Sequence, residues 1–152
     1  MKKAVLFFFL FLSFSFTGKA IQWEARTGLS ISGNWGLHTS AYMGIPVSSL
    51  FALRPAVILH TVERNSYQAA DKWHIGVLVP VFGSFRIPVH EKMNLRLDAG
   101  PYVGTGKEPH FGGAAEAGME VGRIYVGAGY FQKFGNGSHS QLNLSVGYKF
   151  TF

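Results

Sequence analysis

Several histidines of this 152-residue chain fall at or near the same end of the strands predicted below. Histidine is therefore the first residue type to consider for a chemical role. Imidazole nitrogens bind several transition metals, so a cluster at one rim of the fold would be a candidate metal site. The spacing fixes no carboxylate beside these histidines, and the chain contains no cysteine. We therefore expect scattered histidines and assign no metal and no other cofactor. The residues concerned are His38, His60, His74, His110 and His139.

Three short stretches could be taken for catalytic or phosphate-binding motifs, but each lacks an essential part. A nucleophile needs a base within hydrogen-bond reach, whereas the neighbours His139 and Ser140 point to opposite faces of an extended strand. His90–Asn94 has no second histidine for a zinc-protease helix. Gly104–Glu108 has Pro101 where a phosphate loop needs glycine, and an acid where it needs Ser or Thr. The sequence therefore predicts no catalytic site.

The charged residues show a stronger pattern. They share one face of their segments with Gly, Ala and Ser, while the opposite face is apolar. Such a mixture suits the interior of a narrow barrel, because glycine leaves room in which Arg and Lys can pair with Asp and Glu. Adjacent segments would bring Arg96 close to Glu116 or Glu120, which favours a buried ion-pair network over a charged selectivity filter. The predicted lumen network consists of Arg54, Arg86, Arg96, Asp98, Glu116, Glu120 and Lys149.

These residues are positioned by segments in which apolar and polar residues alternate, as they do in strands. In Asn94–Gly104, for example, Leu95 and Leu97 alternate with Arg96 and Asp98. Turn-forming residues separate the segments at short intervals. We expect short turns at one end of the sheet, near residues 48–51, 89–93 and 121–123, and loops at the other end, near residues 34–38, 65–71, 105–110 and 135–139. We predict eight strands, at residues 23–34, 39–48, 52–64, 72–88, 94–104, 111–121, 123–134 and 140–152.

Two features fit simple alternation poorly. Leu78, Pro80 and Phe82 interrupt the polar face of the fourth segment. Proline also lacks the backbone donor that a sheet ladder needs. Because Pro80 and Pro101 lie inside predicted strands, we expect a β-bulge at each of them.

The distribution of charge decides which face of the sheet is the interior. In a soluble sandwich the apolar face packs inward and the charges face water. Here the polar face is crowded with small residues and charges of both signs, so the apolar face looks toward lipid. Transmembrane barrel strands alternate in this way over about 10 residues, and closure pairs every backbone amide without water. The sequence predicts an all-β fold, an eight-stranded antiparallel up-and-down transmembrane β-barrel.

Aromatic residues fall near both predicted rims, as in the girdles of outer-membrane barrels. One rim would carry Trp23, Phe85, Phe150 and Phe152, and the other Trp35, Trp73, Tyr130 and Phe134.

The start of the chain has the layout of a cleavable signal peptide. Lys2 and Lys3 precede the apolar run Ala4–Phe16, and small residues follow up to Ala20. We expect residues 1–20 to be removed, which leaves a single barrel domain at residues 21–152. Removing three lysines lowers the formal charge from +6 to +3, so a nucleic-acid partner is not expected.

The last segment alternates strictly from Leu142 to a terminal phenylalanine, Phe152. Ser145, Gly147, Phe150 and Phe152 fit a pattern that resembles the C-terminal assembly signal of bacterial outer-membrane barrels. In that family the barrel-assembly machinery recognises the last strand through strand pairing. The resemblance implies that this machinery is a partner during insertion.

Residues 21–152 as a whole resemble small eight-stranded barrels of the OmpA/OmpX type, and more narrowly the porin-like or PorT-like barrel proteins of the Bacteroidetes. The resemblance is carried by Ile45–Val47, Leu95–Gly104, Val126–Tyr130 and Leu144–Phe150. It implies a place in the outer membrane of a Gram-negative bacterium, with both termini in the periplasm. It also implies contact with outer-membrane lipid and lipopolysaccharide.

The resemblance implies an architecture rather than a reaction. We expect a non-enzymatic protein with a structural, adhesive or surface-interaction role, a lumen filled by side chains, and loops that could meet an extracellular protein or another surface ligand. A small channel or a secretion-system accessory barrel is the alternative. A lipid-modifying enzyme is less expected, because the His-x-Ser-Asn pattern of lipid A deacylase barrels is absent.

Overall fold

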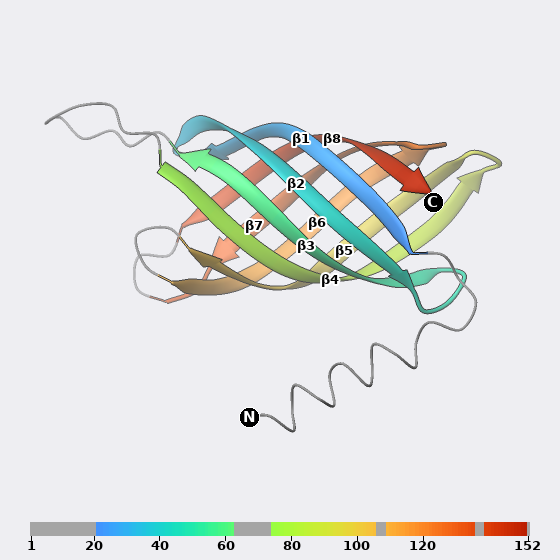
Figure 1. Cartoon of the computed structure of the whole chain (residues 1–152), viewed down its shortest axis with the longest axis horizontal. Helices are drawn as coiled ribbons and strands as arrows, with labels where there is room; N and C mark the ends of the chain where they lie inside the picture. Colours follow the sequence, from blue (N-terminus) through green and yellow to red (C-terminus); the bar gives the residue numbers. More distant parts are fainter. Residues whose placement is uncertain (1–20, 63–73, 106–108, 136–138, 152) are drawn as a thin grey trace, which may run out of the picture.

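The computed structural model describes residues 21–62, 74–105, 109–135 and 139–151, which form a closed antiparallel barrel (Figure 1). Each strand pairs with its neighbours in the chain, and the last strand closes the barrel against the first. No helix long and apolar enough to cross a membrane occurs in the described ranges. The strands are β1 (Gln22–Ser32), β2 (Asn34–Pro46), β3 (Phe51–Val62), β4 (His74–His90), β5 (Met93–Thr105), β6 (His110–Val121), β7 (Ile124–Lys133) and β8 (Ser140–Thr151).

The two ends of the barrel differ in their connections. The lower end, on the right in Figure 1, holds the start of β1, the end of β8 and three short turns at residues 47–50, 91–92 and 122–123. The upper end holds the other four connections. The short lower turns were predicted from the sequence. The predicted loop at residues 65–71 lies outside the described residues, as do the predicted signal peptide and Phe152.

The prediction of a loop at residues 34–38 is wrong. β2 begins at Asn34, and the chain reverses direction at Gly33, whose φ is 78°. Trp35 then pairs with Ile31, and His38 with Gly28. Glycine adopts this left-handed conformation without a steric penalty, so the reversal needs fewer residues than the composition of the stretch suggested.

The predicted bulges at Pro80 and Pro101 are also wrong. Pro80 pairs with Tyr102, and Pro101 with Gly113, in unbroken register. In the β4–β5 ladder, pairing stops after Pro80 and resumes at Gly83 without a shift. Each proline removes one donor, and the ladder bridges that gap rather than inserting a residue. The shift in this strand pair lies instead between Pro88 and His90.

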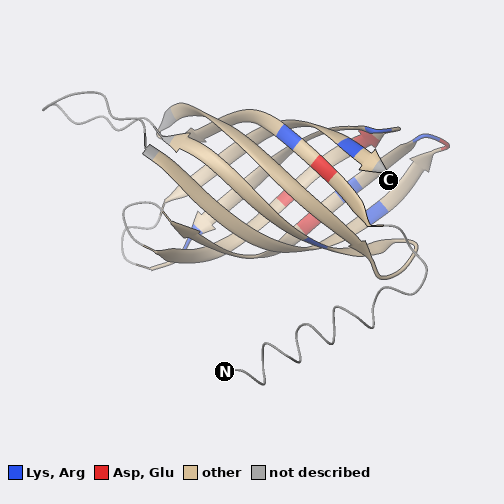
Figure 2. Cartoon of the chain, in the orientation of Figure 1, with Lys and Arg blue, Asp and Glu red and all other residues tan. Residues whose placement is uncertain are grey.

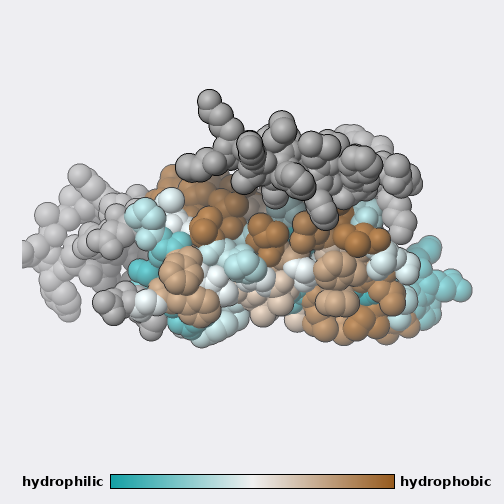
Figure 3. Space-filling view, turned by 90° about the horizontal axis from the view of Figure 1, so that it is seen from below, coloured by the Kyte–Doolittle hydropathy of each residue, from teal (hydrophilic) through white to brown (hydrophobic). Residues whose placement is uncertain are grey.

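The wall of the barrel presents apolar side chains to the outside and encloses charge. Leu97 and Val126 are 42% and 55% exposed, whereas Arg96 and Glu116 are 1% and 5% exposed. On the face seen in Figure 3, apolar side chains cover much of the wall and hydrophilic residues gather toward the ends. This inverts the arrangement of a soluble protein, and it matches a barrel whose surroundings are hydrocarbon.

The aromatic residues predicted for the girdles are exposed wherever the structure describes them. Trp73 and Phe152 lie outside the described residues. The exposed members are Trp23, Phe85 and Phe150 toward the lower end, and Trp35, Tyr130 and Phe134 toward the upper end.

Candidate functional site: the filled lumen

Most of the charged residues lie in the lower half of the barrel, on the right in Figure 2, and those on the inner face are buried in the lumen. The structure brings all seven predicted network residues together there, and adds Glu24 and Arg26 of β1 to them. The network contains five cations and four carboxylates. Its members are Glu24, Arg26, Arg54, Arg86, Arg96, Asp98, Glu116, Glu120 and Lys149.

Arg26 occupies the middle of this network, and its side chain is fully buried. Its Nη1 donates to Glu116 Oε2 at 2.7 Å, and it also contacts Glu24. The guanidinium carbon lies 3.7 Å from the Tyr42 ring centroid and 3.9 Å from that of Tyr125, so Arg26 is held between two aromatic rings. Desolvated cation–π contacts of this kind are each worth about 2 kcal/mol. Tyr42 also donates its hydroxyl to Glu116 Oε1 at 2.9 Å.

Glu24 and Asp98 join the arginines of three strands. Arg54 donates from Nη2 to Glu24 Oε2 at 3.0 Å and from Nη1 to Asp98 Oδ2 at 3.1 Å. Arg96 donates from Nη1 to the same Glu24 oxygen at 2.8 Å, and its Nε lies 3.2 Å from Asp98 Oδ2. The carboxylates thus tie β1 and β5 to arginines on opposite sides of the lumen.

Glu120 anchors the lowest part of the network. The sequence left Glu116 and Glu120 as alternative partners of Arg96. In the structure Arg96 pairs directly with Glu120. Glu120 Oε2 also lies 2.9 Å from Arg86 Nε and 3.0 Å from Lys149 Nζ. Arg86 and Lys149 are partly exposed, so the network ends in cations at the lower mouth.

Four members of this site were not predicted. Glu24 and Arg26 lie on the same face of β1 as Ser30, opposite the apolar Ala25 and Leu29, so the alternation already contained a signal for them. The other two members, Tyr42 and Tyr125, stack on Arg26. The sequence carries no such signal for them, because tyrosine is equally typical of an outer aromatic girdle.

Glycines on the inner face make room for the large side chains. A Cβ at Gly118 would lie 2.4 Å from the Tyr125 ring, and one at Gly127 would lie 2.1 Å from its hydroxyl oxygen. A Cβ at Gly147 would lie 2.6 Å from Arg26 Cγ. Gly147, predicted as part of the assembly signal, therefore also has a packing role inside the barrel.

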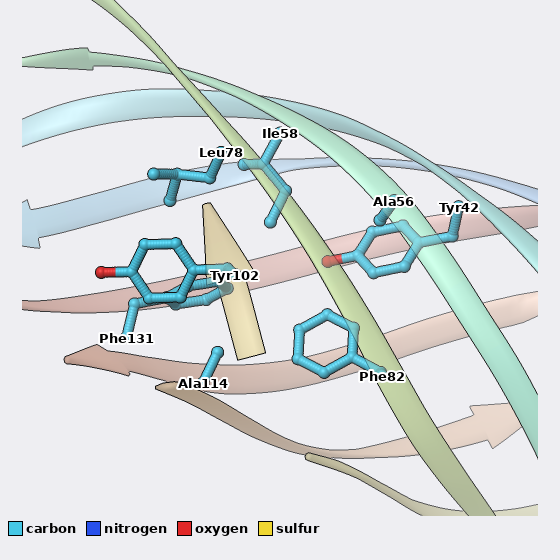
Figure 4. Close-up of a cluster of buried hydrophobic side chains, with 8 residues drawn as sticks. All are labelled: Tyr42, Ala56, Ile58, Leu78, Phe82, Tyr102, Ala114 and Phe131. Atoms are coloured by element: carbon cyan, nitrogen blue, oxygen red, sulfur yellow. The ribbon is translucent and has the colours of Figure 1, made fainter. Parts of the chain in front are cut away.

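An apolar layer fills the lumen above the ion network (Figure 4). Phe82 is fully buried, and its ring centroid lies 6.3 Å from that of Tyr42 and 6.4 Å from that of Phe131. Phe82 and Leu78, which interrupted the polar face of their segment, belong to this layer. The layer consists of Tyr42, Ala56, Ile58, Leu78, Phe82, Tyr102, Ala114 and Phe131.

The two layers leave little free space in the lower lumen. A cavity of about 40 Å³ opens near the lower mouth beside Gln22, Arg54 and Arg86. Such a volume holds only a few water molecules. A barrel of eight strands is narrow enough for side chains to fill it, and the packing here follows that rule.

The remaining sequence candidates do not converge on a reactive centre. His38 Nε2 lies 3.1 Å from Ser145 Oγ, but the two residues are 4% and 7% exposed and face the lumen, away from any lipid substrate. His139 and Ser140 are both exposed. No group of three or more His, Cys, Asp or Glu residues able to hold a metal ion occurs in the described part of the chain. The side chain of His74 lies outside that part.

Comparison with known proteins gives a fold but no family. No family model matches the chain, and no curated protein matches it. The crystal structure of Neisserial surface protein A is similar, with a TM-score of 0.63 and 12% identity over 87% of this chain and 96% of that one. The chain has the fold of a small transmembrane β-barrel.

Two further solved structures share this fold. The N-terminal β-barrel domain of Pseudomonas aeruginosa OprF gives a TM-score of 0.55 and 11% identity over 85% of this chain and 97% of that one. The Yersinia pestis outer membrane protein Ail in a phospholipid bilayer nanodisc gives a TM-score of 0.54 and 12% identity over 87% of this chain and 100% of that one. Identities this low establish the architecture alone. At that level they agree with the resemblance to OmpA/OmpX-type barrels.

Proposed function

We propose that the chain is a non-enzymatic integral protein of the outer membrane of a Gram-negative bacterium, with a structural, adhesive or surface-interaction role. The observation that carries this proposal is the lumen, where an ion network and an apolar layer lie one above the other inside an apolar wall. Arg96 of the network is 1% exposed, and Glu120 of the network and Phe82 of the apolar layer are both 0% exposed. A barrel filled in this way acts through its surfaces rather than through its interior.

The surface role is supported by a difference between the two ends of the barrel. The lower end has only short turns, whereas two of the upper connections, residues 63–73 and 134–139, are longer. We propose that the lower end faces the periplasm, and that the upper connections meet an extracellular protein or another surface ligand. One protein of similar fold is named a surface protein, and another is named the attachment invasion locus protein. The apolar wall would contact outer-membrane lipid and lipopolysaccharide.

Two parts of the proposal concern export and assembly. Residues 1–20 would be the cleaved signal peptide. The barrel-assembly machinery would recognise β8, where Ser145 and Gly147 face the lumen and Phe150 is 41% exposed on the outside. The narrower likeness to the porin-like or PorT-like proteins of the Bacteroidetes is part of the same proposal.

Place and fold are tested together by separating outer from inner membranes on a density gradient. We expect the protein in the outer-membrane fraction, as a gel band that shifts when the detergent sample is heated. A band in the inner-membrane or soluble fraction would contradict the location, and a band that does not shift on heating would contradict the barrel fold.

The filled lumen is tested separately in planar lipid bilayers. We expect no discrete current steps from the folded wild-type barrel, because Phe82, Phe131 and Tyr102 occupy the lumen. A variant that carries Phe82→Ala and Phe131→Ala provides a positive comparison, since it removes two rings of the apolar layer. Regular current steps from the wild type would favour the small-channel alternative instead.

The surface role is tested by replacing residues 63–73 with a Gly/Ser segment of equal length. The matched control replaces the lower turn at residues 91–92. We expect the first change to abolish adhesion of expressing cells to matrix or host-cell surfaces while insertion stays intact, and the second to leave adhesion unchanged. Equal adhesion by the wild type and by cells without the barrel would contradict an adhesive role.

A further inference from the structure

Above the apolar layer, the upper lumen holds a buried histidine that the proposed surface role does not use. His60 of β3 is only 8% exposed. Neither of its ring nitrogens has a hydrogen-bond partner among the described residues. Leaving a buried polar group unpaired costs about 1–3 kcal/mol, so an unpaired imidazole calls for a specific explanation such as an ion.

The rings of His60 and of His110 on β6 lie over the two strands between them, β4 and β5. A Cβ at Gly76 would lie 2.3 Å from His60 Nε2, which places this ring directly over β4. A Cβ at Gly104 would lie 2.6 Å from His110 Nε2, which places that ring over β5. Since β4 and β5 are adjacent strands between β3 and β6, the two rings lie over neighbouring strands, and Gly76 is two residues from Leu78, the partner of Gly104.

His38 lies beside His60 in the register but is turned the other way. Its Nε2 lies 3.1 Å from Ser145 Oγ of β8, and a Cβ at Gly28 of β1 would lie 2.9 Å from its Cε1. Among the histidines whose side chains the structure describes, His60 and His110 are therefore the two that lie over the upper ends of β4 and β5.

The donor atoms define which ligand this pair would take. Hard cations such as Mg²⁺ and Ca²⁺ prefer oxygen ligands. The four carboxylates that the described residues place in the lumen, however, lie in the lower network and are bound to arginine or lysine. Neutral imidazole suits late transition metals, and copper binds most tightly among the divalent ions of the first row.

We propose that His60 and His110 form a binding site for a late first-row transition-metal ion, Cu²⁺ or Zn²⁺, at the upper end of the lumen. The two imidazoles supply two nitrogen ligands, and water completes the coordination. The ion gives the buried His60 ring the partner that it lacks among the described residues. This inference does not depend on the surface role.

The site is tested on the full-length barrel without a histidine tag, folded in detergent and titrated with Cu²⁺. We expect one equivalent to bind, with an electron paramagnetic resonance spectrum that shows coupling to two nitrogen nuclei. His60→Ala and His110→Ala should each weaken binding by about tenfold or more, since even the loss of an outer-shell partner weakens metal binding by 10- to 100-fold. The matched control is His139→Ala, which removes an exposed histidine near the same end.

Several results would overturn the assignment. An oxygen-only spectrum, or no saturable binding by the wild type, excludes the site without any variant. Wild-type affinity in folded His60→Ala and His110→Ala excludes it as well. If His38→Ala or His139→Ala abolishes binding while His110→Ala does not, the ion is held elsewhere. The heat-dependent band shift shows in each case that the variant is folded.

Discussion

Replacing Arg26 by methionine removes a charge from the middle of the lumen while keeping a side chain of similar length. Arg26 is the only cation that the structure pairs with Glu116 among the described residues, at 2.7 Å. Glu24 and Asp98 keep Arg54 and Arg96 as partners. The penalty therefore falls on Glu116, which is 5% exposed and retains only the Tyr42 hydroxyl.

Breaking a buried ion pair by removing one partner costs about 3–5 kcal/mol. We expect Arg26→Met to lower the free energy of unfolding by that amount, or about two to four decades in the equilibrium constant. Arg26→Met combined with Glu116→Gln should recover about 2 kcal/mol of the loss, because the orphaned charge is then gone. Arg26→Lys should fall between, since lysine keeps the charge but not the planar stacking.

The assay is urea unfolding of the barrel in phospholipid vesicles, followed by tryptophan fluorescence and by the heat-dependent band shift. The matched control is Arg123→Met in the exposed β6–β7 turn, where we expect no measurable shift of the unfolding midpoint. An Arg26→Met barrel within about 1 kcal/mol of the wild type would refute the reasoning. Strict additivity of the Arg26 and Glu116 substitutions would do the same, because the pair would then not be coupled.

Three further predictions concern the wall, the packing and the assembly of the barrel. Leu144→Arg, at a position 42% exposed in the middle of β8, should cost about 2–4 kcal/mol in the same unfolding assay, whereas Val121→Arg at the lower end of β6 should cost about 0–1 kcal/mol; equal costs would contradict a wall that spans hydrocarbon. Gly118→Ala should destabilise the barrel by about 1–3 kcal/mol, because its Cβ would meet the Tyr125 ring; an unchanged unfolding midpoint would count against this packing. Phe150→Ala should lower the amount of barrel inserted in cells without slowing unassisted refolding of the purified chain into detergent micelles; normal insertion in cells would count against an assembly signal at this residue.

Alternation predicted the strands and their orientation because it depends only on local strand geometry. Successive side chains of any strand point to opposite faces, so Arg96 and Leu97 were assigned to the lumen and to the outer wall without knowledge of the fold. The same rule, applied to β1, would have found Glu24 and Arg26. Charge then showed which face was inside, since ion pairs among glycines do not suit a water-facing surface.

The division of the lumen into two layers could not be predicted in the same way. The depth of a side chain along the barrel depends on strand tilt and on the stagger accumulated around all eight strands. Neither quantity is visible within one strand, so Phe82 read as an irregularity rather than as part of an apolar layer. The partner of Arg96 was ambiguous for the same reason. The bulges at Pro80 and Pro101 were predicted wrongly because a proline within a strand is compatible both with a missing hydrogen bond and with an inserted residue.

The ion network also constrains the order in which the barrel can assemble. Glu24 and Arg26 belong to the first strand, but their partners come much later in the chain. Glu24 binds Arg54 and Arg96, which lie 30 and 72 residues after it. Arg26 binds Glu116, which lies 90 residues after it. A partly built sheet would leave Glu24 and Arg26 with only each other as partners, and an unpaired charge in hydrocarbon costs about 3 kcal/mol. We therefore expect the early hairpins to stay in an aqueous environment until the late strands are added. Entry into the bilayer would then coincide with neutralisation of the interior.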